Sequence, residues 1–293
     1  MASPNHATDI ELKAPITGQD VPGLDLAPVR SRFSALERRI DGASVVYLDG
    51  PGGSQAPDSV ARAVAEYLTG MNANADGPFA TSVATDRLLH DARLAAADFL
   101  GCTAEEVVFG ANTTTINFLL AHALARTLKP GDEIIVTELD HDANVAPWLL
   151  VAADHGLTVR TAPLDPGDGT LDEAALEALI SPHTKVIACT LASNALGSIP
   201  DMQRVAAAAQ NVGALLWVDA VHFAPHRRLN RAAIGADVLL TSAYKYFGPH
   251  LGVAAIRSDL ARTLPADRVR PANEVPAGHR FETGTLCHEA IAG

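Results

Sequence analysis

Short apolar runs alternate with helical segments from residue 107 onward, and this alternation constrains the fold more than any other feature. The runs have strand length and end in polar residues; they span residues 107–109, 133–137, 185–191, 214–222 and 237–240. Ala- and Leu-rich stretches such as 171–180 and 205–210 lie between them. Apolar strands separated by helices are typical of a parallel sheet covered on both faces. The sequence therefore predicts an α/β fold with a mostly parallel sheet.

Polar residues follow the ends of five of these runs. They are Asn112 and Thr113; His141; Asn194; Asp219 and His222; and Ser242 and Lys245. Open α/β sheets bind ligands in the crevice outside the carboxyl ends of their strands. We therefore expect these side chains to form one site.

Lys245 and Asp219 are the most specific members of this set. A lysine amine that a loop holds in place and partly desolvates is nucleophilic near neutral pH and can form a Schiff base. A carboxylate at the end of a buried strand is costly unless it pairs with a cation, and the protonated pyridine nitrogen of pyridoxal 5'-phosphate (PLP) is such a cation. The alternatives are an exposed loop lysine and a helix-capping aspartate. The two residues together favour PLP.

The segment 110–115 (Gly-Ala-Asn-Thr-Thr-Thr) joins a strand to a helical run. Free backbone N–H groups, the helix dipole and the hydroxyl groups predict an anion site there. The alternative is an ordinary Asn or Thr helix cap. The segment has no Walker lysine and no G-x-G-x-x-G pattern, which disfavours nucleotides and dinucleotides.

His141 follows the run 133–137. Its imidazole could stack on a flat heteroaromatic ring and relay protons, or it could be structural. A metal site made of Asp140, His141 and Asp142 is the other alternative. Adjacent residues of an extended segment point to opposite faces, so we predict no metal. Asn194 would offer an amide to the ring oxygen or to a substrate carboxylate.

Several longer motifs resemble one family. They are Y-L-D-G-P-G-G at 47–53, D-H-D-A-N-V-A-P-W at 140–148, S-N-A-L-G at 193–197, V-D-A-V-H at 218–222, S-A-Y-K-Y-F-G-P-H at 242–250 and R-F-E-T-G-T at 280–285. The chain resembles the class V aminotransferase and cysteine desulfurase superfamily of fold-type I PLP enzymes, and most closely its cysteine desulfurase-like subgroup. The likeness runs from about Phe33 to the last residue. It implies a three-layer αβα fold.

The resemblance implies a role for each site residue. Lys245 would carry the Schiff base and move the Cα proton, Asp219 would pair with the pyridine nitrogen, and His141 would stack on the ring. Asn194 would contact the ring oxygen with His222 nearby, and Thr113, Asn112 and Ser242 would hold the phosphate. Thr285 would reach the phosphate of a neighbouring subunit, which implies a homodimer with shared active sites.

The implied reaction converts the amino acid L-cysteine to L-alanine and passes sulfur to an acceptor protein. Aminotransferase, epimerase and β-lyase reactions use the same residues and remain alternatives. The chain departs from familiar desulfurases at Asp142 and Tyr244, where those enzymes have histidine, and at Asn112, where threonine is usual. These departures put cysteine specificity in doubt.

The family continues beyond the Thr285 region into a small domain that carries a substrate-binding arginine and a persulfide-forming cysteine. The sequence stops at Gly293, so we expect this domain to be missing. The remaining alternatives are therefore a catalytically weak fragment and a non-catalytic chain.

The three cysteines do not replace that persulfide cysteine. Cys102 and Cys189 are expected to be structural thiols. Cys287 precedes His288, whose imidazole could lower the thiol pKa and allow a redox role. The cysteine spacing predicts neither a disulfide framework nor a zinc site.

Bulk properties and segment composition complete the expectations. A net charge of −12 disfavours a nucleic-acid partner or an anionic membrane surface. No apolar segment reaches bilayer length and the start lacks a secretory signal, so we expect a cytoplasmic protein. Residues 1–30 are expected to form a poorly ordered polar arm, and 31–293 one PLP-binding domain. The loop 72–82 is expected to line the active site.

Overall fold

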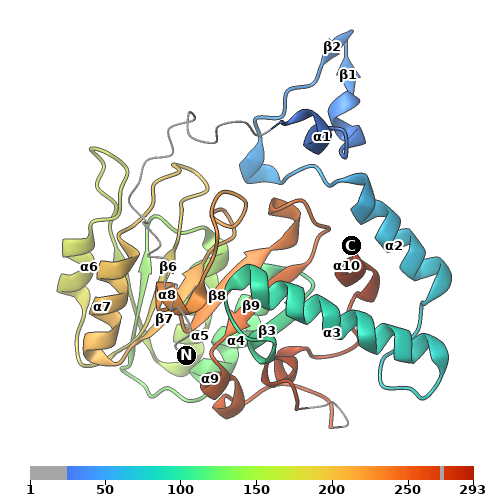
Figure 1. The fold of residues 1–293 in the computed structure, drawn as a ribbon. Helices are drawn as coiled ribbons and strands as arrows, with labels where there is room; N and C mark the ends of the chain where they lie inside the picture. The colour runs from blue at the N-terminus through green and yellow to red at the C-terminus, as the bar shows by residue number, and fades with distance from the viewer. Residues whose placement is uncertain (1–24, 271–273) are drawn as a thin grey trace, which may run out of the picture.

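The computed structural model describes residues 25–270 and 274–293, and its centre is a seven-stranded sheet. The order of the strands across the sheet is β3-β9-β8-β7-β6-β4-β5 (Figure 1). Their bounds are β3 Val107–Gly110, β4 Glu133–Thr137, β5 Thr158–Ala162, β6 Thr184–Thr190, β7 Leu215–Asp219, β8 Val238–Ser242 and β9 Gly252–Ile256. Strands β5, β4, β6, β7 and β8 are parallel, and β9 is antiparallel to both of its neighbours, β8 and β3. The predicted mostly parallel α/β sheet is confirmed.

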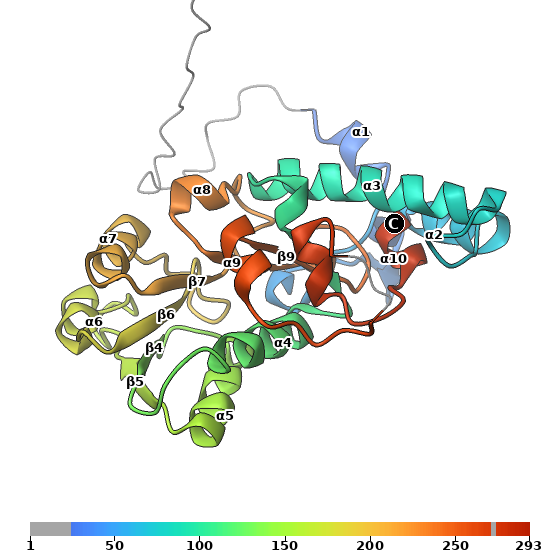
Figure 2. The same ribbon diagram turned by 90° about the horizontal axis from the view of Figure 1, so that it is seen from below.

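Helices cover both faces of this sheet (Figure 2). Their bounds are α1 Ala27–Arg30, α2 Asp58–Gly70, α3 Ala80–Leu100, α4 Thr113–Ala125, α5 Ala146–His155, α6 Glu173–Leu179, α7 Met202–Val212, α8 Arg231–Ile234, α9 Ser258–Thr263 and α10 His288–Ala292. One apolar cluster packs α3, α6, α7 and α8 on the first face, and a second packs α4, α5 and α9 on the other. The expected three-layer αβα arrangement is therefore confirmed.

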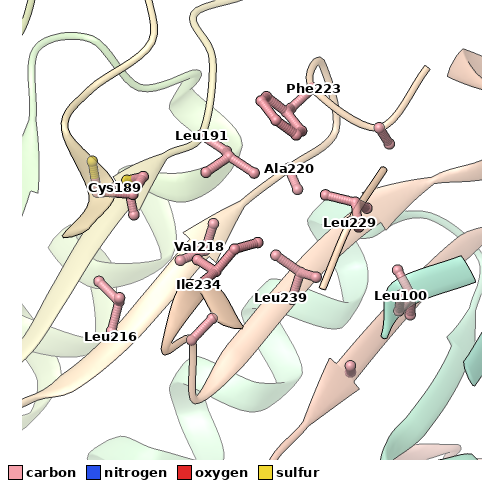
Figure 3. Close-up of a cluster of buried hydrophobic side chains, with 14 of the residues drawn as sticks. Leu100, Cys189, Leu191, Leu216, Val218, Ala220, Phe223, Leu229, Ile234 and Leu239 are labelled. Atoms are coloured by element: carbon pink, nitrogen blue, oxygen red, sulfur yellow. The ribbon is translucent and has the colours of Figure 1, made fainter. Parts of the chain in front are cut away.

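The central strands are apolar throughout because each buries both of its sides. In β7, Leu216 and Val218 belong to the first cluster and Trp217 to the second. Side chains alternate between the two faces of a strand, so a strand covered on both sides needs apolar residues at every position. Figure 3 shows the first cluster, to which Cys189 of β6 contributes its thiol.

The N-terminal part of the described chain lies apart from the sheet. Helix α1 and the hairpin of β1 (Arg39–Ile40) and β2 (Ala43–Ser44) stand above the main body in Figure 1. Of the predicted arm, residues 1–24 lie outside the described residues, and 25–30 are exposed. No helix in the described part of the chain has the length and apolar character needed to cross a bilayer.

A buried ion pair ties α3 to the C-terminal segment. One guanidinium nitrogen of Arg93 donates to Oε2 of Glu282 at 2.5 Å, and another donates to the Val107 carbonyl oxygen at 2.9 Å. The other carboxylate oxygen of Glu282 accepts the Phe109 N–H at 2.8 Å. Arg93 is 7% exposed and Glu282 is 3% exposed. The pair therefore fastens two distant segments to β3.

Strand β9 approaches the start of α4 so closely that glycine is required at position 252. A Cβ on Gly252 would lie 2.4 Å from the carbonyl carbon of Asn112 and 2.8 Å from Cδ1 of Ile116. Backbone atoms cannot retreat as a flexible side chain can, so the close approach sets where α4 begins. This matters because the N-terminus of α4 borders the cavity described next.

Candidate active site

A cavity of about 160 Å³ lies at the carboxyl ends of the strands, where the sequence predicted a ligand site. Seven predicted site residues line it; they are Thr113, His141, Asn194, Asp219, His222, Ser242 and Lys245. They follow β3, β4, β6, β7 and β8 along the chain. All of the residues predicted from strand ends therefore line one cavity, with the exception of Asn112; Thr285, which was assigned from the resemblance, does not line it.

Lys245 is held in place and buried. It ends a 3₁₀ turn (Ala243–Lys245) directly after β8, is 7% exposed, and donates to the carbonyl oxygen of Pro51. Its Nζ also lies 5.2 Å from the centroid of the Tyr244 ring, which in turn stacks on His250 at 5.0 Å. The alternative of an exposed loop lysine is therefore wrong.

Asp219 ends β7 and is 5% exposed. Burial raises the pKa of its carboxyl, while one N–H bond and the charges of His141 and Lys245 act in the opposite direction. The N–H comes from Val221, at 2.8 Å, within a turn rather than at the start of a helix. A buried carboxylate in this setting favours a cationic ligand group beside it.

Two buried hydroxyl groups meet at the N-terminus of α4. Oγ1 of Thr113 and Oγ of Ser242 are 2.6 Å apart, and the Thr113 hydroxyl donates to the Thr241 carbonyl oxygen. Both side chains line the cavity, as does Thr114. A helix N-terminus with converging hydroxyl groups suits an anion.

Asn112 lies at the same helix start, but it acts as an ordinary helix cap, which was the alternative to an anion site. Its Oδ1 accepts the N–H of Thr115 at 2.8 Å and the Thr115 hydroxyl at 3.0 Å. It thus caps α4 and does not line the cavity. Thr285 is exposed in the C-terminal segment and does not line the cavity of its own chain either. Its action on a neighbouring subunit stays a prediction.

His141 and Asp140 point in different directions. Nδ1 of His141 accepts the N–H of Ala143 at 3.0 Å, at the cavity wall. The Asp140 carboxylate instead accepts from the Thr137 hydroxyl at 2.5 Å and from Asn144 Nδ2 at 2.8 Å. Burial raises the Asp140 pKa to about 7. Within residues 25–270 and 274–293, no group of three or more His, Cys, Asp or Glu side chains could hold a metal ion.

His222 carries a buried nitrogen with unmet hydrogen-bonding capacity. Its Nδ1 has no partner among the described residues. Burial, and then the charges of His226 and Lys245, lower the pKa of the His222 imidazole. A neutral ring in this position offers one nitrogen to a polar ligand group in the cavity.

Pro51 and Tyr244 also line the cavity, although sequence reasoning assigned neither to the site. Pro51 lies in the turn Gly50–Gly52, and the run Gly-Pro-Gly-Gly at 50–53 was the available signal for it. Gly53 has φ of 132°, and a Cβ there would lie 2.9 Å from the Tyr244 ring. The loop 72–82, by contrast, does not line the cavity; it was expected there only for its polarity.

The cysteines lie away from this chemistry. Burial raises the pKa of Cys189 well above its usual value and that of Cys102 to about 12. The redox alternative for Cys287 is not supported, because partial burial raises its pKa and the His288 imidazole does not lower it. The His288 ring is turned away and shares a hydrogen bond with the Tyr67 hydroxyl at 3.1 Å.

The polar groups of this cavity match the chemical groups of PLP. The cavity offers a buried amine (Lys245), an unpaired buried carboxyl (Asp219) and paired hydroxyl groups at a helix N-terminus (Thr113 and Ser242). His222 also lines the cavity, and its Nδ1 is a buried polar atom without a hydrogen-bond partner among the described residues.

Residues 46–293 match the family model of the class V aminotransferases. The chain belongs to this family. It is 38% identical over 231 residues to the aminotransferase-like protein FGM3 of Gibberella zeae, covering 77% of this chain and 56% of that protein. It is 35% identical over 241 residues to a cysteine desulfurase of Serratia proteamaculans, covering 81% of this chain and 59% of the relative.

Class V aminotransferase folds that have been solved superimpose well on this chain. The apo cysteine desulfurase of Thermococcus onnurineus NA1 matches with a TM-score of 0.83 and 29% identity, covering 90% of this chain and 68% of the other. The chain thus spans somewhat more than half the length of the two curated relatives and about two thirds of this structure. The resemblance expected from the motifs is confirmed at the level of the superfamily.

Proposed function

We propose that this chain binds PLP covalently through Lys245 and acts on an amino acid, with desulfuration of L-cysteine to L-alanine as its reaction. The observation that carries the proposal is the convergence of Lys245, Asp219 and the Thr113–Ser242 hydroxyl pair on one cavity. The names of the relatives supply the choice of reaction. Another class V reaction remains the second candidate, favoured by Tyr244 in place of the usual histidine.

Each site residue would bind a different part of the cofactor. Bound PLP supplies an electron sink for negative charge that develops at the substrate Cα. Asp219 would keep the pyridine nitrogen protonated, and Thr113 and Ser242 would bind the phosphate with the N-terminus of α4. His141 would stack on the ring, and Asn194 and His222 would contact its oxygen.

Lys245 would also move a proton. Its amine would take the proton from the substrate Cα and later return it. The contacts with the Pro51 carbonyl oxygen and the Tyr244 ring fix the direction of this amine. We further propose a cytoplasmic homodimer in which Thr285 contacts the partner's phosphate, and a protein acceptor for the sulfur.

Reconstitution with PLP tests the proposal. A folded chain should gain a visible absorption band, and borohydride should fix the pyridoxyl group on one lysine, which peptide mass spectrometry should identify as Lys245. With L-cysteine, and with dithiothreitol as the reductant that releases the sulfur as sulfide, the chain should then yield alanine and sulfide in equal amounts. A folded chain with no band contradicts the cofactor assignment, and a band without alanine favours another class V reaction or the catalytically weak fragment.

Asp219→Asn should separate stability from chemistry. The amide keeps an oxygen for the Val221 N–H but removes a buried charge whose pKa is raised. A native pKa above the unfolded value makes ionised Asp219 a cost that grows as pH rises, so the variant should melt no lower than wild type at pH 8. Its PLP-dependent rate should nevertheless fall by about 100-fold or more.

Thermal melts of the apo chain at pH 5 and pH 8, together with exchange of the substrate Cα proton for deuterium, measure both effects. Asp259→Asn, at an exposed carboxylate that pairs with Arg257, is the control for loss of one charge. If the Asp219→Asn variant exchanged the substrate Cα proton at the wild-type rate, Asp219 would have no role in the reaction.

A further inference from the structure

A continuous chain of buried hydrogen bonds runs from the second apolar cluster to the turn that carries His141. Nε1 of Trp217 donates to Oδ1 of Asn117 at 2.8 Å. Nδ2 of Asn117 donates to the Ala143 carbonyl oxygen at 2.7 Å and to Oδ1 of Asn144 at 3.1 Å. Nδ2 of Asn144 donates to Asp140 at 2.8 Å. The side chains of Trp217, Asn117 and Asn144 are all fully buried.

The groups at the two ends of this series of hydrogen bonds, the Trp217 indole and the Asp140 carboxylate, fix the donor and acceptor of every bond between them. An indole N–H can only donate, so the Asn117 oxygen must face Trp217 and its NH₂ must face Ala143 and Asn144. The oxygen of Asn144 then accepts, and its NH₂ faces Asp140. The Asp140 carboxylate accepts this bond and others from the Thr137 hydroxyl and the Thr190 N–H. No amide can flip without breaking a buried bond, which costs about 1–3 kcal/mol.

The same turn fixes the tautomer of His141. Two hydrogen bonds hold the backbone of this turn at Ala143. The Ala143 carbonyl oxygen accepts from Asn117, and the Ala143 N–H donates to Nδ1 of His141. An N–H can only donate, so the neutral His141 ring has a bare Nδ1 and carries its proton on Nε2. The nitrogen left for a ligand in the cavity is thus a donor.

We propose that Asn117 and Asn144 are positioning residues that orient His141 through Ala143 and keep its proton on Nε2, so that His141 serves the site as a hydrogen-bond donor to an anionic oxygen or sulfur and not as a base. This deepens the proposed function, on which it rests for the identity of the ligand. Lys245 is then the base of the site and His141 a neutral hydrogen-bond donor. Trp217, at the other end of these hydrogen bonds, lies in β7 and does not line the cavity.

Histidine nitrogen NMR on the chain without PLP tests the positioning role. In protein labelled with [¹⁵N]histidine, Nδ1 of His141 should resonate as a bare nitrogen and Nε2 as a protonated one, with His141→Gln giving the assignment. Asn117→Leu removes the donor to Ala143, and both resonances should move toward the values of a tautomer mixture. Asn230→Ala, which removes the cap of α8 through Ala233, is a matched loss of one side-chain bond and should leave His141 unchanged.

If Asn117→Leu does not fold, Trp217→Phe gives a second test: it keeps an aromatic ring beside Trp148 but removes the donor that orients Asn117, and it should shift the same two resonances. A folded variant whose His141 resonances equal those of wild type overturns the proposal, as does a wild-type His141 with a protonated Nδ1. The readout needs no cofactor, so absence of a PLP band in wild type would defeat the proposed function and leave this result standing.

Discussion

Lys245→Ala is expected to abolish the covalent PLP adduct and to lower amino-acid turnover by roughly a million-fold, the loss found when a covalent catalytic residue is removed from another enzyme. The side chain is buried, and its amine is bonded to the Pro51 carbonyl oxygen inside the cavity. A truncated side chain leaves the site without an amine to bind the cofactor or move the Cα proton. The folded state should persist, because a buried cation is removed along with its desolvation cost.

The measurement pairs visible absorption with borohydride trapping and mass spectrometry, and circular dichroism reports the fold. Lys129→Ala, at an exposed lysine after α4, is the matched control and should keep the band. A trapped adduct of equal yield in Lys245→Ala would place the reactive amine elsewhere and remove the central element of the proposed function.

Arg93→Met is expected to destabilise the chain by about 3–5 kcal/mol, because it leaves Glu282 buried without its cation. Burial alone would raise the Glu282 pKa, but bonds and charge from His279 and Arg93 hold it below its usual value. A lowered native pKa stabilises the fold above the unfolded pKa of the carboxyl and loses that contribution as pH falls through the native one. The loss in the variant should therefore be largest at neutral pH and shrink in acid.

Urea unfolding at pH 7 and pH 4 measures this difference. The control is Arg262→Met, which breaks an exposed pair with Glu105 at 2.5 Å and should cost less than about 1 kcal/mol. Equal losses in the two variants would mean that the buried pair contributes no more to stability than the exposed one.

The sequence predicted the parallel strands well because burial on both faces makes them apolar throughout. It missed β5, an edge strand in which Thr158, Arg160 and Thr161 are exposed. It also missed β9 (Gly252–Ile256), because Gly252 was interpreted as part of the loop that follows Lys245. Apolarity reports burial but carries no information on strand direction, so the antiparallel return of β9 could not be predicted from the pattern.

In the candidate site, too, some residues could be predicted from the sequence and others could not. Strand-end residues such as Thr113 and Asp219 were predictable because parallel strands end at one edge of the sheet. For Pro51 the run at 50–53 indicated a turn but not its position, because only tertiary packing brings that turn against Lys245. Asn112 marks another limit, since helix capping and anion binding select the same residue types, and only the contact with Thr115 distinguishes them.

The order of strands in the sheet has a consequence for synthesis on the ribosome. Strand β3 emerges before every other strand of the seven-stranded sheet, yet among the described strands it pairs with β9 alone. The strands from β4 to β8 can join as they emerge, while β3 must wait for the last of the seven. The hydroxyl pair of Thr113 and Ser242, separated by 129 positions, is completed only when that late strand is inserted. A nascent chain thus has most of its sheet before its proposed phosphate site can form.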